Sequence, residues 1–289
     1  MSRLYYELIK DIPSSLPELD GDLLRCTGHN LVSLAARTTC LPLTTIHEEI
    51  KDQTAAVVPI SSGEGVIPGF TDAVAAILEY IGLKAWVTGH PDVVGFGEAV
   101  ESGADILFAA DDLEFLAINP RNRKVVENAW ATANGFVQAL AAAAEMRSDT
   151  LEGQEVLTLG LGKVGTHAVK AFRKLGSRTW VFDTDSTRLQ ACADQHKDVQ
   201  VVKDLKMAFQ TIDYILDATP AAEIIDESMI RPTTIISCPG VPHGLTPAAR
   251  AKIGTGFIHD NLPLGVAVMA LESLYSNKEG ASMPKMLNR

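Results

Sequence analysis

The chain has 289 residues, of which 46% are hydrophobic and 21% charged, enough for one large core or two ordinary ones. Its formal net charge of -11 repels phosphate backbones and acidic membranes, which argues against nucleic acid and membrane partners. The four cysteines form no C-x-x-C pair, so neither a disulfide framework nor a metal site is expected. The first residues lack the apolar core of a signal peptide, which predicts a cytoplasmic protein.

The first half of the chain begins with a predicted helical segment, residues 1–54, in which leucines recur on one helical face. A small α/β substrate domain is expected next, over residues 55–148. Its strands are predicted at 55–60, 85–88, 104–110 and 115–118, and its helices at 71–81 and 95–101. A long helix, expected to begin at residue 121 and to end in an alanine-rich stretch, links this domain to the next.

A glycine-rich motif opens the second half. The apolar run 156–159 ends in Gly160, Gly162 and Gly165 at G-x-G-x-x-G spacing, a helical pattern follows, and a second strand ends at Asp183. Gly160 permits a tight turn, Gly162 lets a pyrophosphate approach the backbone, and Gly165 lets the helix pack closely on the strand. The helix N-terminus offers unpaired N–H groups to the phosphates. This combination predicts a dinucleotide-binding site.

The residue at the end of the second strand bears on which dinucleotide binds. Asp183 can accept hydrogen bonds from both adenosine ribose hydroxyls, and no arginine follows it directly, so NAD is favoured over NADP. Arg188, five positions later, is the residue that can instead reach a 2′-phosphate. Strand-end loops complete the expected site, because ligands of a doubly wound sheet lie beyond the carboxyl ends of its strands. The residues expected to bind the cofactor are Gly160, Leu161, Gly162, Lys163, Val164, Gly165, Asp183, Ala218, Thr219, Pro220 and Pro239, with Gly240 and Asn261 beside them.

The later strands are expected at 214–217, 233–237 and 256–259, followed by a helix at 266–274. The sequence therefore predicts an α/β protein, in which N-terminal helices and a small α/β substrate domain precede a doubly wound Rossmann dinucleotide-binding domain. The predicted boundaries place that second domain at 149–275 and a flexible tail at 276–289.

Two predicted strands of the first half end in polar residues: Ser61 and Ser62 after one, Asp111 and Asp112 after the other. If these strands are parallel, both sets meet at one rim, where a carboxylate can hold a cationic amine and accept its proton. Hairpin-turn and helix-cap chemistry explains the same residues about as well. His243 is either an acid or base near the nicotinamide or a solvated loop histidine.

Several segments resemble the pyrrolysine-forming dehydrogenases of the PylD family, over a span from about residue 25 to residue 271. The most specific are Pro59-Ile-Ser-Ser-Gly63 and Ala110-Asp-Asp112, because the dinucleotide motif is common to many families. Other matching segments are Arg25-Cys-Thr-Gly28, His90-Pro-Asp-Val93, Ala218-Thr-Pro220, Pro239-Gly-Val-Pro242 and Pro263-Leu-Gly265. Residues 1–20 and 127–132 depart from the family pattern.

The resemblance implies an NAD-dependent oxidation of the terminal amine of 3-methyl-D-ornithyl-N6-L-lysine. The product loses ammonia and closes on the remaining ornithine amine to give the ring of pyrrolysine. Asp111 is then expected to be the catalytic carboxylate that orients the reacting amine. Substrate-binding roles carry over to Ser61, Ser62, Asp112 and Asn119.

Two other interpretations stay open at this point. One is a related two-domain dehydrogenase of the shikimate or methylenetetrahydrofolate type, which also places a substrate domain before a dinucleotide-binding domain. The other is a non-catalytic NAD-binding sensor with a protein partner. A polar rim facing the nicotinamide favours an enzyme, whereas a large exposed apolar patch favours a binding module. The expected partner is a small-molecule amine, and a homodimer is left open.

Overall fold

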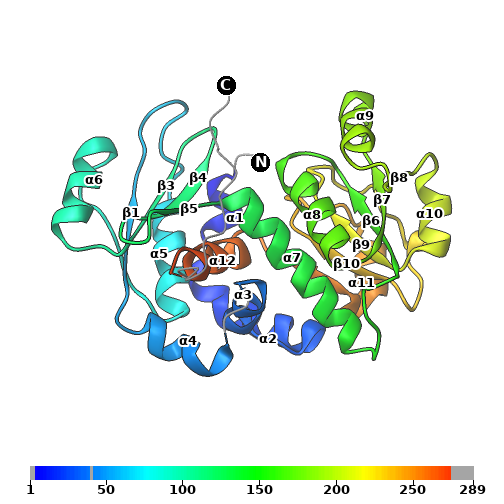
Figure 1. Ribbon diagram of the computed structural model, residues 1–289, viewed down its shortest axis with the longest axis horizontal. Helices are drawn as coiled ribbons and strands as arrows, with labels where there is room; N and C mark the ends of the chain where they lie inside the picture. Colours follow the sequence, from blue (N-terminus) through cyan, green and yellow to red (C-terminus); the bar gives the residue numbers. More distant parts are fainter. Residues whose placement is uncertain (1–3, 40–41, 275–289) are drawn as a thin grey trace.

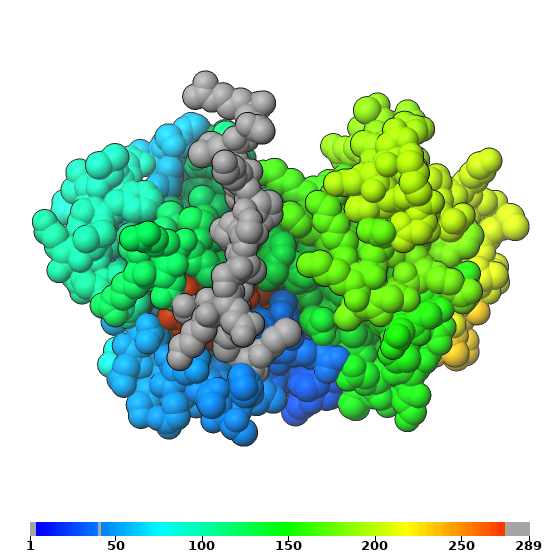
Figure 2. Space-filling view, in the orientation of Figure 1, coloured from blue at the N-terminus to red at the C-terminus, as the bar shows by residue number. Residues whose placement is uncertain are grey.

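The computed structural model describes residues 4–39 and 42–274, so the predicted tail at 276–289 lies outside the described residues. Two sheets lie side by side, joined by the long helix α7 (Asn128–Glu145), with the first helices running beneath both (Figure 1). In the space-filling view the two halves are separate lobes, cyan to green and yellow-green, with the blue N-terminal helices along one side (Figure 2). The predicted fold class is confirmed: an α/β chain with N-terminal helices and a doubly wound second half.

The first sheet has the strand order β2-β1-β3-β4-β5, with β1, β2 and β3 parallel and the last two antiparallel. Its strands are β1 (Thr54–Val58), β2 (Lys84–Val87), β3 (Ile106–Ala110), β4 (Phe115–Asn119) and β5 (Lys124–Glu127). After Thr54, strand β1 is apolar and buried because both of its faces are covered. Ala55 and Val57 join the core around α5 (Phe70–Tyr80), whereas Ala56 and Val58 join the cluster under α6 (Asp92–Glu101).

The prediction of a helix beginning at residue 121 was wrong. Residues 121–123 form a turn, in which Arg123 has a φ of 54°, and 124–127 pair with β4 as strand β5. The helix α7 begins only at Asn128. Val125 and Val126 favour a strand, and the neighbouring β4 offers them a ladder of backbone hydrogen bonds, so tertiary pairing overrides the helical pattern that follows.

The second sheet has the order β11-β10-β9-β6-β7-β8, with all of its pairs parallel. Its strands are β6 (Glu155–Leu159), β7 (Arg178–Phe182), β8 (Gln200–Val201), β9 (Tyr214–Asp217), β10 (Ile235–Cys238) and β11 (Phe257–His259). The helices of this half are α8 (Lys163–Lys174), α9 (Ser186–Gln195), α10 (Leu205–Thr211) and α11 (Pro247–Ile253). The strand order reverses between β6 and β9, which is where a doubly wound sheet opens its ligand crevice. Strand β8 is not predicted from the sequence, because it has only two residues.

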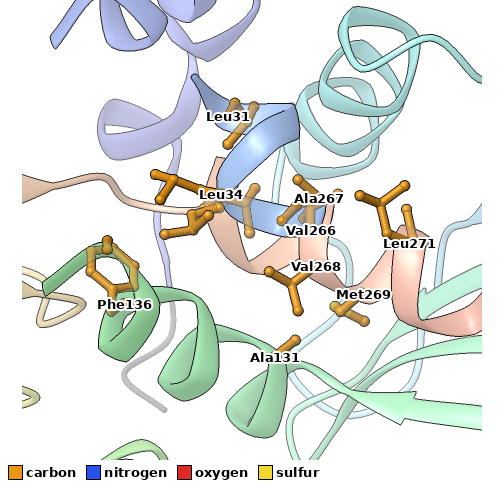
Figure 3. Packing of buried hydrophobic residues seen from close by; sticks show 14 of the residues in the cluster. Leu31, Leu34, Ala131, Phe136, Val266, Ala267, Val268, Met269 and Leu271 are labelled. Atoms are coloured by element: carbon orange, nitrogen blue, oxygen red, sulfur yellow. The ribbon is translucent and has the colours of Figure 1, made fainter. Parts of the chain in front are cut away.

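The last helix, α12 (Pro263–Leu274), leaves the second sheet and packs on α7, α3 (Leu31–Thr39) and α5 and on strands of the first sheet. The predicted boundaries had placed these residues in the dinucleotide-binding domain. Figure 3 shows Val266 and Ala267 of α12 next to Leu34, and Val268 and Met269 of α12 above Ala131 of α7. Side chains of α12 pack directly on the backbone of α7 at Gly135, since a Cβ there would lie 3.0 Å from Leu264 Cγ. The alanines of α7 allow this packing, so one core runs between the two halves.

The N-terminal helices are α1 (Tyr6–Ile9), α2 (Ile12–Thr27), α3 (Leu31–Thr39) and α4 (Leu43–Ile50). Helix α2 contacts both halves, through α5 on one side and β11 on the other. Leu4, just before α1, is buried. Across residues 4–39 and 42–274, no helix is both long enough and apolar enough to cross a membrane.

Candidate dinucleotide and substrate site

The glycine loop after β6 has the backbone shape that the motif predicts. Gly160 has a φ of 83°, in the left-handed region, and a Cβ there would meet Ala218 O at 3.1 Å. A Cβ on Gly165 would lie 1.8 Å from Gly160 O, so α8 packs on the loop only because this position is glycine. These two glycines are therefore required by packing inside the protein.

Gly162 differs from the other two glycines. It is the N-cap of α8, with no side chain capping the helix, and a Cβ there would meet nothing within 4 Å. Open space thus lies in front of the N–H groups that begin α8, and these groups favour an anion. The cradle fits the pyrophosphate of a dinucleotide, and its glycine keeps it open rather than serving the packing.

Asp183 follows β7 and lies beside this loop. Its Oδ2 accepts a hydrogen bond from Leu161 N at 2.6 Å, and its Oδ1 accepts one from Asp185 N at 2.8 Å. The Arg188 guanidinium approaches Asp183 Oδ2 to 3.9 Å. The carboxylate expected on the ribose and the arginine able to meet a 2′-phosphate therefore lie side by side.

A cavity opens between the ends of β9 and β10, α7 and the start of α12; we name it the cofactor cavity. It contains much of the predicted strand-end set, together with residues from the N-terminus and α12. Its lining is Leu4, Asn128, Thr132, Phe136, Val164, Ala218, Thr219, Pro220, Pro239, Gly240, Val241, Asp260, Asn261, Leu262 and Gly265.

Asp217, at the end of β9, fixes the loops that line the cofactor cavity. Its Oδ1 accepts hydrogen bonds from Thr219 N at 3.0 Å and Thr219 Oγ1 at 2.7 Å, and its Oδ2 accepts one from Gly244 N at 3.1 Å. Burial raises the pKa of Asp217, and these hydrogen bonds oppose the rise. Close packing also fixes these loops against each other, because a Cβ on Gly240 would lie 2.2 Å from Thr219 O.

A second cavity, of about 180 Å³, lies at the carboxyl ends of β1 and β3; we name it the acidic cavity. Its polar lining comes mainly from the loop after β1 and from the β3–β4 hairpin. The charged side chains of that lining are Glu64, Asp111, Asp112, Glu114 and Lys163. Among the described residues the lining thus carries four carboxylates and one ammonium, which favours a cationic ligand.

Asp111 serves the hairpin turn and also faces the acidic cavity. Its Oδ1 accepts hydrogen bonds from Leu113 N at 2.8 Å and Glu114 N at 2.7 Å, as an Asx turn requires. Within the described part of the chain, no hydrogen bond engages Oδ2. One oxygen therefore holds the turn, and the other remains able to bind a ligand.

Asp112 joins the hairpin to the loop after β1. Its Oδ2 accepts a hydrogen bond from Glu64 N at 2.8 Å, and Gly63, with a φ of 70°, leaves room for this carboxylate. A Cβ at position 63 would lie 2.0 Å from Asp112 Oδ2. Asp112 thus positions the rim of the acidic cavity.

Lys163, predicted to bind the cofactor, reaches the other half of the molecule. Its Nζ donates to Leu113 O at 2.9 Å and forms an ion pair with Glu114 at 2.5 Å. The first residue of α8 thereby contacts the hairpin that carries Asp111. The dinucleotide loop and the acidic cavity are therefore directly connected.

Three predicted substrate residues do not line the acidic cavity. Ser61 donates its N–H and hydroxyl to the Asp92 carboxylate at the start of α6, and Ser62 is exposed beside it. Asn119 lies at the opposite end of the strands from Asp111, because β4 runs antiparallel to β3, and its Oδ1 accepts Asn122 N at 3.1 Å. These placements do not support substrate contact by these side chains in this conformation.

His243 lines neither cavity. Its ring packs edge-on against His259 at 5.4 Å, and His259 Nδ1 lies 2.7 Å from Cys238 O. Burial lowers the pKa of His259 to about 4. The pair is therefore part of the packing around β11.

Leu4, Asn128 and Leu262 line both cavities, and the sequence interpretation had given none of them a role. Asn128 is buried at the start of α7, where its Nδ2 contacts Met269 Sδ at 3.2 Å and Thr132 Oγ1 donates to its Oδ1 at 3.4 Å. Both contacts are weak, so the amide retains capacity for a ligand where the two cavities meet. The sequence signal for Asn128 is its match to the family pattern, together with Asn122 and Lys124, and that match alone does not indicate a ligand.

Known proteins resemble the chain at two levels. The sequence profile described as pyrrolysine biosynthesis protein PylD, N-terminal domain, matches residues 18–126. A pyrrolysine synthase of Methanosarcina acetivorans is 32% identical over 273 residues, covering 93% of this chain and 98% of the relative.

Two solved shikimate dehydrogenases share the fold at lower identity. The Aquifex aeolicus enzyme is 12% identical, with a TM-score of 0.52, over 79% of this chain and 94% of that one. The Thermus thermophilus enzyme, solved with NADP(H) and shikimate, is 18% identical, with a TM-score of 0.51, over 77% and 93%. These structures show a common two-domain fold, and the near full-length sequence match identifies the chain as a member of the pyrrolysine biosynthesis protein PylD family.

Proposed function

We propose that the protein is an NAD-dependent dehydrogenase that oxidises the terminal amine of 3-methyl-D-ornithyl-N6-L-lysine, with ammonia release and ring closure to pyrrolysine. The observation that carries the proposal is the meeting of two cavities. The cofactor cavity and the acidic cavity share Leu4, Asn128 and Leu262. A nicotinamide in one and an amine in the other would be neighbours at that junction. The name of the Methanosarcina relative, pyrrolysine synthase, supports the same reaction.

The charge of the acidic cavity supports an amine substrate. Alkyl amines have pKa values near 10.4 and are cationic at neutral pH. The carboxylates of Glu64, Asp111, Asp112 and Glu114 favour such groups, and Lys163 offers a partner to a substrate carboxylate. Shikimate carries a carboxylate and no amine, so this lining weighs against the shikimate-type alternative. A developed acidic cavity beside the cofactor cavity also favours an enzyme over a sensor.

The residues of the site have distinct roles in the proposed reaction. The glycine loop and Asp183 hold the NAD, which supplies the hydride acceptor when bound. Asp111 Oδ2 orients the ammonium group and accepts its proton, because hydride leaves the neighbouring carbon readily only from the neutral amine. Leu4 and Leu262 exclude water from the junction of the cavities. The second ornithine amine then attacks the imine carbon and ammonia leaves, without a covalent bond to the protein.

The test is to incubate the protein with NAD and the methylornithyl-lysine substrate, and to measure NADH absorbance together with ammonia. We expect NADH and ammonia to form in equal amounts. Shikimate and free ornithine serve as controls and should give no NADH. NADH formation from shikimate, with none from the amine, would replace this proposal by the shikimate-type alternative.

We expect the protein to bind NAD at least about tenfold more tightly than NADP, a free-energy difference of about the same size as a shift of one pKa unit. Asp183 would repel a 2′-phosphate, and its neighbour Arg188 only partly offsets that charge at 3.9 Å. Asp183→Ala should reduce the difference between the affinities for NAD and NADP, and Arg188→Ala should increase it. Titration of the protein with both cofactors measures each ratio. Comparable affinities of the wild-type protein for NAD and NADP would contradict the prediction.

A further inference from the structure

Asp260 is a buried carboxylate that the proposed reaction does not use. It follows β11, and its Oδ1 accepts a hydrogen bond from Leu262 N at 2.9 Å. Both of its oxygens lie 3.4 Å from Leu264 N, at the start of α12. Burial raises the pKa of Asp260 to about 7, and these N–H groups oppose the rise. The Asp260 carboxylate therefore caps the N-terminus of α12 and is buried from solvent.

The position of Asp260 in the cofactor cavity gives this charge a second consequence. The cavity is lined by apolar side chains, backbone, and the neutral groups of Asn128, Thr132, Thr219 and Asn261. Among the described residues that line this cavity, Asp260 is the only one with a titratable side chain. The strand-end loops at 218–220 and 239–241, which line the same cavity, are those expected around a nicotinamide.

The nicotinamide ring carries a positive charge in NAD and none in NADH. A buried carboxylate attracts a neighbouring cation strongly, because the surrounding protein screens the pair far less than water does. It has no such attraction for the neutral reduced ring. Both forms make the same contacts through the pyrophosphate and the adenosine. A carboxylate in this cavity therefore changes the affinity for one redox form alone.

We propose that Asp260 makes this site bind oxidised NAD in preference to NADH, and so favours release of the reduced cofactor after turnover. The inference rests on the proposed use of NAD. An alternative role for Asp260 is only to cap α12. The two roles differ in a measurable way, because loss of a cap would loosen the cavity for both redox forms equally.

The experiment titrates NAD and NADH separately against three proteins: the wild type, Asp260→Asn and Asp20→Asn, at a pH well above the pKa of Asp260. Asparagine is a good helix cap, so the first substitution removes the charge and keeps the hydrogen bonds. Asp20 is the matched control, since its Oδ1 accepts Leu31 N at the start of α3, away from both cavities. Thermal unfolding without cofactor verifies that each variant is folded.

We expect Asp260→Asn to weaken NAD binding about tenfold or more, the effect of one opposite charge at close range, and to change NADH binding less than about twofold. Asp20→Asn should change neither. Equal losses for NAD and NADH, or no loss for either, would overturn the inference and leave the proposed function standing. A wild-type protein that binds neither form would overturn both. If Asp260→Asn does not fold, Asp260→Ser, which retains a capping oxygen, undergoes the same comparison.

Discussion

Asp111→Asn is expected to lower the rate of NADH formation on the order of 10²-fold or more and to leave NAD binding unchanged. The two carboxylate oxygens of this side chain differ in their hydrogen bonds. Asp111 Oδ1 accepts Leu113 N and Glu114 N in the hairpin turn, and an asparagine carbonyl can accept the same two bonds. The substitution replaces the remaining oxygen by an NH₂ group, which neither attracts an ammonium nor accepts its proton. Fold and turn should therefore persist while turnover is lost.

Steady-state rates with the methylornithyl-lysine substrate, together with NAD titration, measure this effect. Asp52→Asn is a suitable control, because Asp52 is exposed, pairs with Lys84 and lines neither cavity. It removes one negative charge from the same half of the molecule without touching the site. Near wild-type turnover by Asp111→Asn would leave this residue as a turn former and would direct attention to Asp112.

Gly162→Val is expected to reduce NAD affinity by 10²-fold or more, on the order of a lost pyrophosphate site, with little change in thermal stability. The backbone at Gly162 has a φ of -70°, which any residue can adopt, and its Cβ would project into open space. That open space is where the pyrophosphate is expected. The new side chain therefore competes with the ligand and not with the protein.

Gly165→Ala is the informative comparison. Its Cβ would lie 1.8 Å from Gly160 O, so α8 must move away from the loop, at a cost of at least about 1–3 kcal/mol in unfolding free energy. Thermal unfolding should thus separate the two glycine variants, and NAD titration should show a loss in both. Unchanged NAD affinity in Gly162→Val would mean that the loop is only a structural turn.

Much of the fold could be predicted from local pattern. The strands β6, β7 and β9 are short apolar runs, and the glycine spacing fixes the turn between β6 and α8, so the doubly wound half was recognisable. Only the first strand of the β4–β5 hairpin was predicted. Val125 and Val126 directly precede the strong helical pattern of α7, and their pairing partner is the neighbouring strand β4. Helix α12 had an evident apolar pattern, but its packing on the first half depends on contacts with α3 and α7 far away in the chain.

The candidate site divides in the same way. Gly160, Gly162 and Gly165 have the backbone conformations or close approaches that their spacing predicts, because a βα turn is a local structure. Serine after a strand gives no direction for its side chain, and Ser61 is held by Asp92 of α6, 31 residues later. Lys163 was placed with the cofactor by its motif, yet its ammonium contacts the hairpin of the other sheet.

The sequence by itself determined the α/β class, the dinucleotide loop and the polar residues that follow β3, since each depends on neighbours within a few positions. Only the tertiary structure decided that Leu4, Asn128 and Leu262 meet between the cofactor cavity and the acidic cavity. These residues come from the N-terminus, the start of the linking helix and the residue just before the last helix, and α12 brings them together by folding back on α7. The physical reason is that burial of the apolar faces of α7 and α12, and not any local pattern, selects which distant segments become neighbours.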